Sequence, residues 1–171
     1  MIRKILRLLL LLCAWSAVIL PRALGEDAFQ APWSSGLILG CWLAVVPLGL
    51  LTGLAELLGR GEPWREGLRG ALLGKLLLIP FFEANFMLGT GAAMVGLFLG
   101  FPLLVALYTA AAAWAALFAT SARVIRALGG LRRAGRITGG GRVLHTLLQL
   151  IFIADLIDGL ALFFGHMPAR E

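Results

Sequence analysis

The chain alternates between long apolar runs and short polar or glycine-rich connections. The apolar runs are long enough to cross a bilayer, which needs about 20 residues in a helix, and they recur along the whole sequence. Because they exceed the usual length of a buried strand, the pattern predicts membrane-spanning helices. The predicted spans cover residues 5–24, 33–58, 71–98, 102–121 and 143–165.

Composition supports this class of protein. Of the 171 residues, 60% are hydrophobic and only 14% are charged, whereas a soluble domain is roughly half apolar and about a quarter charged. The connections are too short to hold a further domain. The sequence therefore predicts an all-α integral membrane helical bundle that forms a single domain over residues 1–171.

The first apolar run allows two interpretations. A basic start, a short apolar stretch and Ala23-Leu24-Gly25 before Glu26 are typical of a cleavable signal peptide, which would leave four spans. Counted from Ile5, the same run is long enough for a membrane helix. We favour a retained first helix, and the alternative stays open.

The basic residues lie in three clusters between the predicted spans. Three precede the first span, four lie in residues 60–75 and six in residues 122–142, whereas the opposite side carries only Arg22 and Arg170. The positive-inside rule predicts a cytoplasmic N-terminus and an external C-terminus in a bacterial inner membrane. This placement indicates topology rather than nucleic-acid binding. We expect anionic lipid headgroups to contact Arg123, Arg126, Arg132, Arg133, Arg136 and Arg142.

Small residues recur every four positions, which places them on one face of a helix and lets helix backbones approach closely in lipid. We expect these faces to hold the bundle together, and one of them could serve a homo-oligomer instead. They comprise Gly36, Gly40 and Ala44, then Gly49 and Gly53, then Ala92, Gly96 and Gly100, and finally Ala111, Ala115 and Ala119.

Polar side chains interrupt the later spans. Pro80 cannot donate to the carbonyl of Leu76 and should kink the third predicted helix. Because a carboxylate in hydrocarbon is costly, we expect the polar groups to face the interior and find partners. The predicted polar site comprises Glu83, Asn85, Tyr108, His145, Gln149, Asp155 and Asp158.

Depth along the predicted helices arranges this polar site in two layers. At 1.5 Å per residue, Glu83 should meet Gln149 or His145, and Tyr108 should meet Asp155. A binding site for a proton or ligand and a hydrogen-bonded staple between helices are both compatible with this pattern. Glu56 lies near a helix end, four residues before Arg60, and is interpreted as half of a surface pair.

Motifs for catalysis are missing from the sequence. It has no HExxH, no CxxC pair and no Ser/His/Asp constellation, and "ITGGGR" follows no strand and precedes no GK[ST]. Cys13 and Cys41 lie inside apolar spans and are interpreted as apolar filler. We expect no enzymatic activity, no metal and no cofactor.

Two segments resemble a family. Lys75 with Ile79-Pro80-Phe81-Phe82 and Asn85-Phe86 resembles a K-x-x-x-IP-[AF]-[YF] signature, and Gln149 through Ile157 resembles Q-[FL]-x-F-x-AD-[VI]-I. Both signatures are typical of an uncharacterised family of small bacterial membrane proteins, a domain of unknown function. The resemblance covers about residues 70–165, implies a multi-span fold and singles out Pro80 and Asp155. Leu78 and Glu83 depart from the family pattern, and the family implies no activity.

We therefore predict an inner-membrane protein that acts as a structural, accessory or regulatory component, with the lipid bilayer, a second copy or another membrane protein as partner. The alternative is a small proton-linked transporter or channel that uses Glu83, Asp155 and Asp158.

Overall fold

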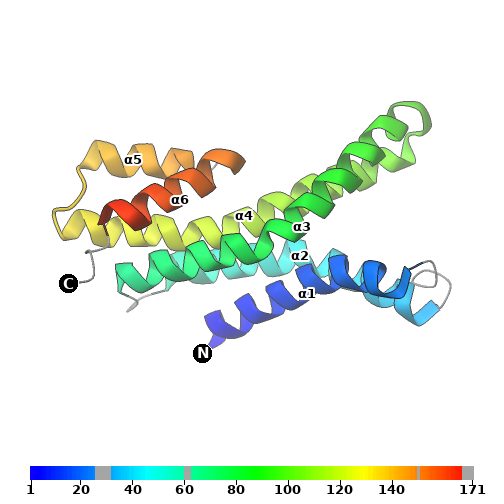
Figure 1. Ribbon diagram of the computed structural model, residues 1–171, viewed down its shortest axis with the longest axis horizontal. Helices are drawn as coiled ribbons and strands as arrows, with labels where there is room; N and C mark the ends of the chain where they lie inside the picture. Colours follow the sequence, from blue (N-terminus) through cyan, green and yellow to red (C-terminus); the bar gives the residue numbers. More distant parts are fainter. Residues whose placement is uncertain (26–31, 60–62, 150, 167–171) are drawn as a thin grey trace. The chain divides into compact units, whose positions relative to one another are not determined.

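The computed structural model describes residues 1–25, 32–59, 63–149 and 151–166. This part of the chain contains six helices and no strand (Figure 1). The helices are α1 (Ile2–Leu24), α2 (Pro32–Leu58), α3 (Trp64–Leu99), α4 (Phe101–Arg133), α5 (Gly139–Leu148) and α6 (Phe152–His166).

Four helices among the described residues, α1 to α4, are long and apolar enough to cross a membrane. They correspond to the first four predicted spans, but two are longer than predicted. Helix α3 begins at Trp64 and runs without interruption through Pro80. Helix α4 continues to Arg133, so the predicted connection over 122–142 is wrong in its first half.

The extension of α4 has a local cause. Buried apolar positions, Val124, Ala127, Leu128 and Leu131, recur on one face beyond residue 121, among arginines and glycines that favour a connection. The helix then ends in a Schellman motif, with the Gly135 amide bound to the carbonyl of Arg132 at 3.0 Å and the Arg136 amide bound to that of Leu131 at 3.0 Å. Gly135 adopts φ 68°, the left-handed conformation that glycine permits at this position.

The single helix predicted over 143–165 is wrong. Helix α5 has 10 residues and α6 has 15, and the two lie side by side as a hairpin (Figure 1). Thr138 caps α5 by accepting a hydrogen bond from the Gly141 amide at 3.1 Å. Neither glycine nor proline marks the break near Gln149, so the hydrophobic pattern could not reveal it.

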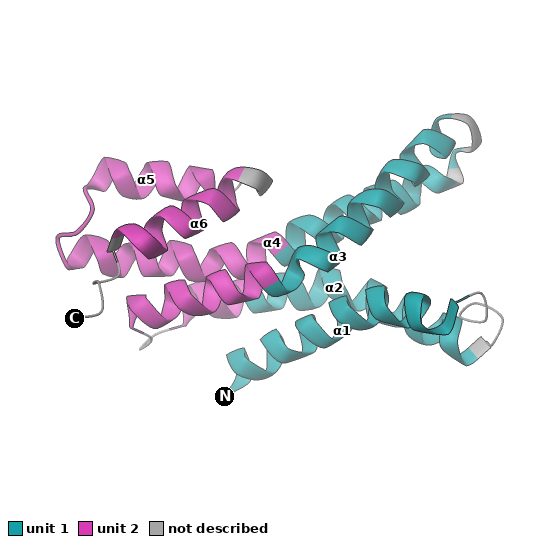
Figure 2. Cartoon of the chain, in the orientation of Figure 1, with its two compact units in different colours: residues 1–52, 77–116 teal, residues 53–76, 117–171 magenta. Residues whose placement is uncertain are grey.

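The chain forms two compact units (Figure 2). Unit 1 comprises residues 1–52 and 77–116, and unit 2 comprises residues 53–76 and 117–171. Helices α2, α3 and α4 each contribute residues to both units.

Unit 1 is built on close helix contacts. Leu10, Ala14 and Val18, four residues apart, form the buried face of α1. A Cβ built on Gly49 of α2 would lie 2.7 Å from the backbone of Ala115 in α4, so only glycine allows this approach. These contacts confirm the packing role of Gly49 and Ala115.

Gly36 and Gly40 of α2 make no close helix contact within the described part of the chain, so the predicted packing inside the bundle is absent there. Both residues are exposed, and a Cβ built on either would meet no atom within 4 Å. Close approach in α2 begins further along the helix, at Gly49, because the residue opposite is the small Ala115.

Unit 2 has its own apolar core. Helices α3, α4 and α6 supply its buried residues, and Trp64 and Ile137 pack against them. The core residues are Leu68, Ala71, Val124, Ala127, Leu128, Leu131 and Leu162. Because Leu162 belongs to this cluster, α6 packs near the end of α4 rather than continuing away from it.

The close approach at Gly49 generates a stability prediction. Gly49→Ala should lower the free energy of unfolding in detergent by about 1–3 kcal/mol, because the added methyl overpacks the contact with the Ala115 backbone. Gly40→Ala, on the same helix but in open space, is the matched control and should show no loss. Equal thermal stability of the two variants would contradict this packing.

Candidate functional site

Lys75 is the centre of a buried polar network in unit 2. It lies in α3 among apolar residues, and only 3% of it is exposed. Its ammonium donates to Gln149 Oε1 at 2.7 Å, to Asp155 Oδ1 at 2.5 Å and to the Asp155 carbonyl oxygen at 3.1 Å. An ammonium has three hydrogens, so these acceptors satisfy it completely.

Asp155 is held by two helices besides its own. Besides the Lys75 ion pair, its Oδ1 accepts a hydrogen bond from Ser121 Oγ of α4 at 3.0 Å. Asp155 lies in the first turn of α6, where the positive end of the helix dipole favours a carboxylate. One side chain therefore ties α6 to both α3 and α4.

Gln149 joins the two halves of the network. Its carbonyl oxygen accepts from Lys75, and its Nε2 donates to Asp158 Oδ2 at 2.7 Å. Gln149 follows the last residue of α5, and its backbone amide closes that helix by donating to the His145 carbonyl at 3.1 Å. Both ends of the buried amide are thus satisfied.

His145 forms the outer end of the network. Its Nδ1 lies 2.5 Å from Asp158 Oδ1, a contact that requires a hydrogen between the two atoms. The His145 side chain is 24% exposed, whereas that of Asp158 is 3% exposed. The network therefore runs from a partly exposed imidazole on α5, through α6, to an ion pair at α3.

A second buried ion pair lies in unit 2. Glu56, at the end of α2, is completely buried, and its Oε2 lies 3.2 Å from Nη1 of Arg126. Arg126 also donates to the Glu56 carbonyl at 2.9 Å, and Arg123 Nε lies 4.0 Å from Glu56 Oε1. The Arg123 guanidinium fills the space beside Gly70, where a Cβ would meet it at 2.2 Å.

The Glu56 pair corrects two predictions. Glu56 is not half of a surface pair, and its expected partner Arg60 lies outside the described residues. Arg123 and Arg126 are largely buried, so their expected contact with lipid headgroups is wrong. Both arginines are on the α4 extension that the sequence did not reveal.

Three polar residues of unit 1, Trp42, Asn85 and Tyr108, form an uncharged cluster. Asn85 is buried, donates to the Thr109 carbonyl and accepts from Trp42 Nε1 at 3.3 Å. The Tyr108 ring packs against that of Trp42 at a 54° tilt, with 4.4 Å between ring centroids, and its hydroxyl donates to the Leu43 carbonyl at 2.6 Å.

The predicted two layers are wrong in their pairing. Tyr108 has the Leu43 carbonyl as its partner, and Asp155 has Lys75 and Ser121. Glu83, expected in the interior beside Gln149 or His145, has an exposed side chain. It follows Phe81 by two residues, so the burial of Phe81 and Asn85 on one face of α3 turns Glu83 outward.

The predicted pairing of Tyr108 with Asp155 is wrong because it assumes one continuous helix over residues 143–165, whereas the structure has two helices, α5 and α6. Once the chain turns back near Gln149, Asp158 contacts His145 and Gln149, whereas Asp155 contacts Lys75 of α3 and Ser121 of α4. His145, Gln149, Asp155 and Asp158 lie in one network with Lys75 and Ser121, whereas the predicted layers separate Gln149 from Asp155.

Lys75 and Ser121 are the members that sequence reasoning missed. Lys75 belongs to the basic cluster over residues 60–75 that predicts the cytoplasmic side, yet it stands alone between Leu72-Leu73-Gly74 and Leu76-Leu77-Leu78. A lone lysine inside an apolar run is itself a signal, because such a charge must find a buried partner. Ser121 carries no comparable signal.

The chemistry of the network is that of charge and hydrogen bonding. It offers one ammonium, two carboxyls, an amide, a hydroxyl and an imidazole, all paired. Within the described part of the chain, no group of three or more His, Cys, Asp or Glu residues is placed to hold a metal ion.

Comparison with known proteins places the chain in a family. No curated protein and no solved structure matches it significantly. A family of unknown function (DUF6652) matches residues 59–167, which include every member of the Lys75 network. The match covers more than half of the chain and agrees with the resemblance seen in its sequence. The protein therefore belongs to this family of unknown function.

Proposed function

We propose that the protein is an integral membrane protein of the bacterial inner membrane that crosses the bilayer with α1 to α4. The length and apolar composition of these four helices support this placement. The guanidinium carbons of Arg65 and Arg136 lie 5.2 Å and 5.6 Å from the centroid of the Trp64 ring. Trp64 therefore has the surroundings of an interfacial tryptophan.

Helices α5 and α6 then form a hairpin that enters the membrane and returns to the same side. At 1.5 Å per residue, α5 is about 15 Å long and α6 about 22 Å, both short of the ~30 Å hydrocarbon core. Val143, Leu144 and Leu147 of α5 are exposed, whereas Gln149 is buried. An apolar outer face and a polar inner face suit a hairpin packed against protein within lipid.

The basic clusters orient the protein. Arg65 and Arg136 meet on Trp64, so the connections before α3 and after α4 belong to the same end of unit 2. Together with the basic N-terminal residues, this supports a cytoplasmic location for that end. The exposed or partly exposed Arg132, Arg133, Arg136 and Arg142 are then the arginines available to anionic headgroups.

The function that this geometry supports best is a structural or accessory role in the membrane. The observation that carries it is the complete pairing of Lys75, which joins α3 to α5 and α6 while Ser121 adds α4. A fully paired ion network favours one fixed arrangement of helices, as a scaffold requires. A carrier would need its charged groups to exchange partners.

Proton-linked transport is the second candidate, and the exposure of His145 favours it. The imidazole is partly open while the acids behind it are closed, which is an arrangement suited to proton entry. The two proposals differ in whether Asp155 must change its protonation state.

The hairpin generates a topology prediction. A green fluorescent protein fused after α6 should fluoresce and an alkaline phosphatase there should be inactive, because a returning hairpin leaves the C-terminus in the cytoplasm. A fusion after α1 should give the opposite pair of results. An active phosphatase after α6 would place the C-terminus outside the cytoplasm. Residues 143–165 would then cross the membrane as a fifth span, which would contradict the hairpin.

The Lys75 network generates a stability prediction. Lys75→Met should lower the free energy of unfolding by about 3–5 kcal/mol, because it strands the Asp155 carboxylate in the interior. The double variant Lys75→Met/Asp155→Asn should recover most of this loss, since no unpaired charge remains. Thermal unfolding in detergent measures both, and a double variant no more stable than the single one would contradict the pairing.

Proton flux into liposomes, followed with a pH-sensitive dye, separates the two candidate functions. The structural role predicts no flux that depends on Asp155, so the double variant and the unmodified protein should behave alike. A proton flux that Asp155→Asn abolishes would establish the transport candidate instead.

A further inference from the structure

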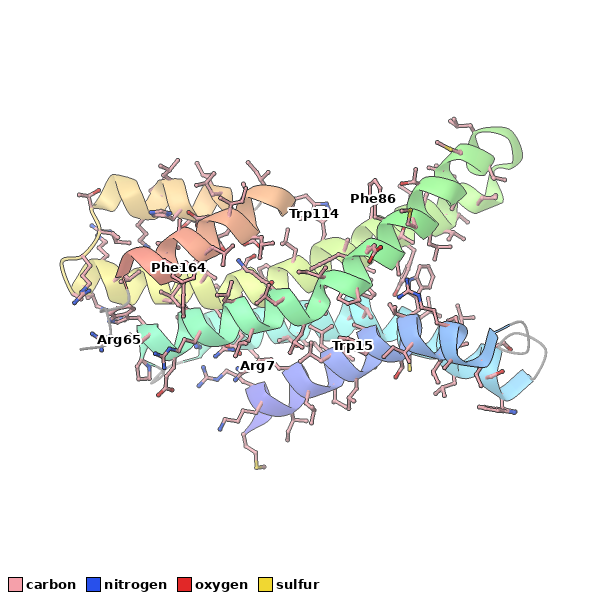
Figure 3. All side chains as sticks on the ribbon, in the orientation of Figure 1. Arg7, Trp15, Arg65, Phe86, Trp114 and Phe164 are labelled. Atoms are coloured by element: carbon pink, nitrogen blue, oxygen red, sulfur yellow. The ribbon has the colours of Figure 1, made fainter. Side chains whose placement is uncertain are left out.

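The outward face of α3 in unit 1 carries a heptad pattern. Glu83, Thr90 and Leu97 are seven residues apart and all exposed, which makes them equivalent to the a positions of a coiled coil. Ile79, Phe86 and Ala93 follow the same repeat at the d positions, and the first two are exposed at 44% and 69%. Figure 3 shows the Phe86 ring projecting from α3.

The acid at the centre of this face needs a partner. Glu83 lies inside the apolar stretch of α3 that is long enough to span a membrane, and large apolar side chains at Phe86 and Met87 surround it. A carboxyl group exposed to hydrocarbon is costly, and such residues face protein or water in folded membrane proteins. Because exposing this face of α3 to lipid would cost free energy, the face is suited to packing against another helix.

We propose that this face of α3 binds the same face of a second copy of the chain, in a parallel pair with the Glu83 carboxyls in contact. This inference rests on the proposed membrane-spanning role of α3. A two-fold axis along the membrane normal brings identical positions together. A carboxyl group can satisfy itself in this way, because one protonated group donates to its partner and the other accepts.

The buried cations Lys75, Arg123 and Arg126 have acidic partners other than Glu83, and the heptad pattern favours a second copy as its partner. Lys75, Arg123 and Arg126 are already paired with Asp155 and Glu56. The heptad itself supports self-pairing, since polar residues at a positions fix register and oligomeric state. Glu83 and Thr90 would supply two such positions.

Cysteine cross-linking in native membranes tests this pair. In a background without the natural thiols (Cys13→Ala, Cys41→Ala), Phe86→Cys should form a disulfide-linked dimer on mild oxidation, because a d position faces its symmetry mate. Leu88→Cys is the matched control, since Leu88 is 50% exposed but lies about 200° around the helix from Phe86. It should remain monomeric.

Variants of Glu83 test the role of the acid. In the Phe86→Cys background, Glu83→Gln should keep the dimer because an amide also donates and accepts. Glu83→Leu should weaken association by about 3- to 15-fold, the range measured for hydrogen bonds between membrane helices. If the Glu83→Leu variant associates as strongly as the protein with Glu83 intact, the proposal is overturned, because the carboxyl group would then contribute nothing to the pairing.

Two further outcomes separate this inference from the membrane proposal. Equal cross-linking at Phe86→Cys and Leu88→Cys, or none at either in protein that resists extraction by alkaline carbonate, would overturn the α3 pair alone. Release of the protein by carbonate would overturn the membrane proposal and this inference with it.

Discussion

The buried ammonium of Lys75 constrains the arrangement of unit 2. A lysine that is only 3% exposed is stable only where acceptors surround it, and those acceptors come from α5 and α6. Gln149 and Asp155 can reach the same nitrogen only if the chain turns between them. The hairpin is therefore a consequence of satisfying one charge, and the apolar core around Leu128 and Leu162 packs beside it.

The two units pair these polar groups in different ways. The charged groups of unit 2 are neutralised in two ion-paired clusters, one at Lys75 and one at Glu56. In unit 1, Asn85 and Tyr108 donate hydrogen bonds to backbone carbonyls. Such fixed pairing suits a protein whose role is to hold a surface in place, and the outward face of α3 is the surface that we propose it presents.

The hydrophobic pattern predicted the helical class and the first four long helices, because apolar runs of this length are rarely compatible with any other secondary structure. It could not predict the α4 extension, since Arg123 and Arg126 read as surface charges until Glu56 is seen to be buried beside them. It could not predict the break near Gln149, which no glycine or proline marks. Four of the seven predicted site residues converge, whereas Glu83 turns outward and Asn85 and Tyr108 form their own cluster.

Solid-state NMR of the protein in lipid bilayers tests the central claim most directly. Lys4 and Lys75 are the two lysines of the chain, so ¹⁵Nζ labelling gives two signals, one of them an internal control. With ¹³Cγ-labelled aspartate, the Lys75 signal should show strong nitrogen–carbon dipolar dephasing from direct contact with Asp155, and the Lys4 signal should show none. Absence of dephasing at both lysines would contradict the buried ion pair and the hairpin that depends on it.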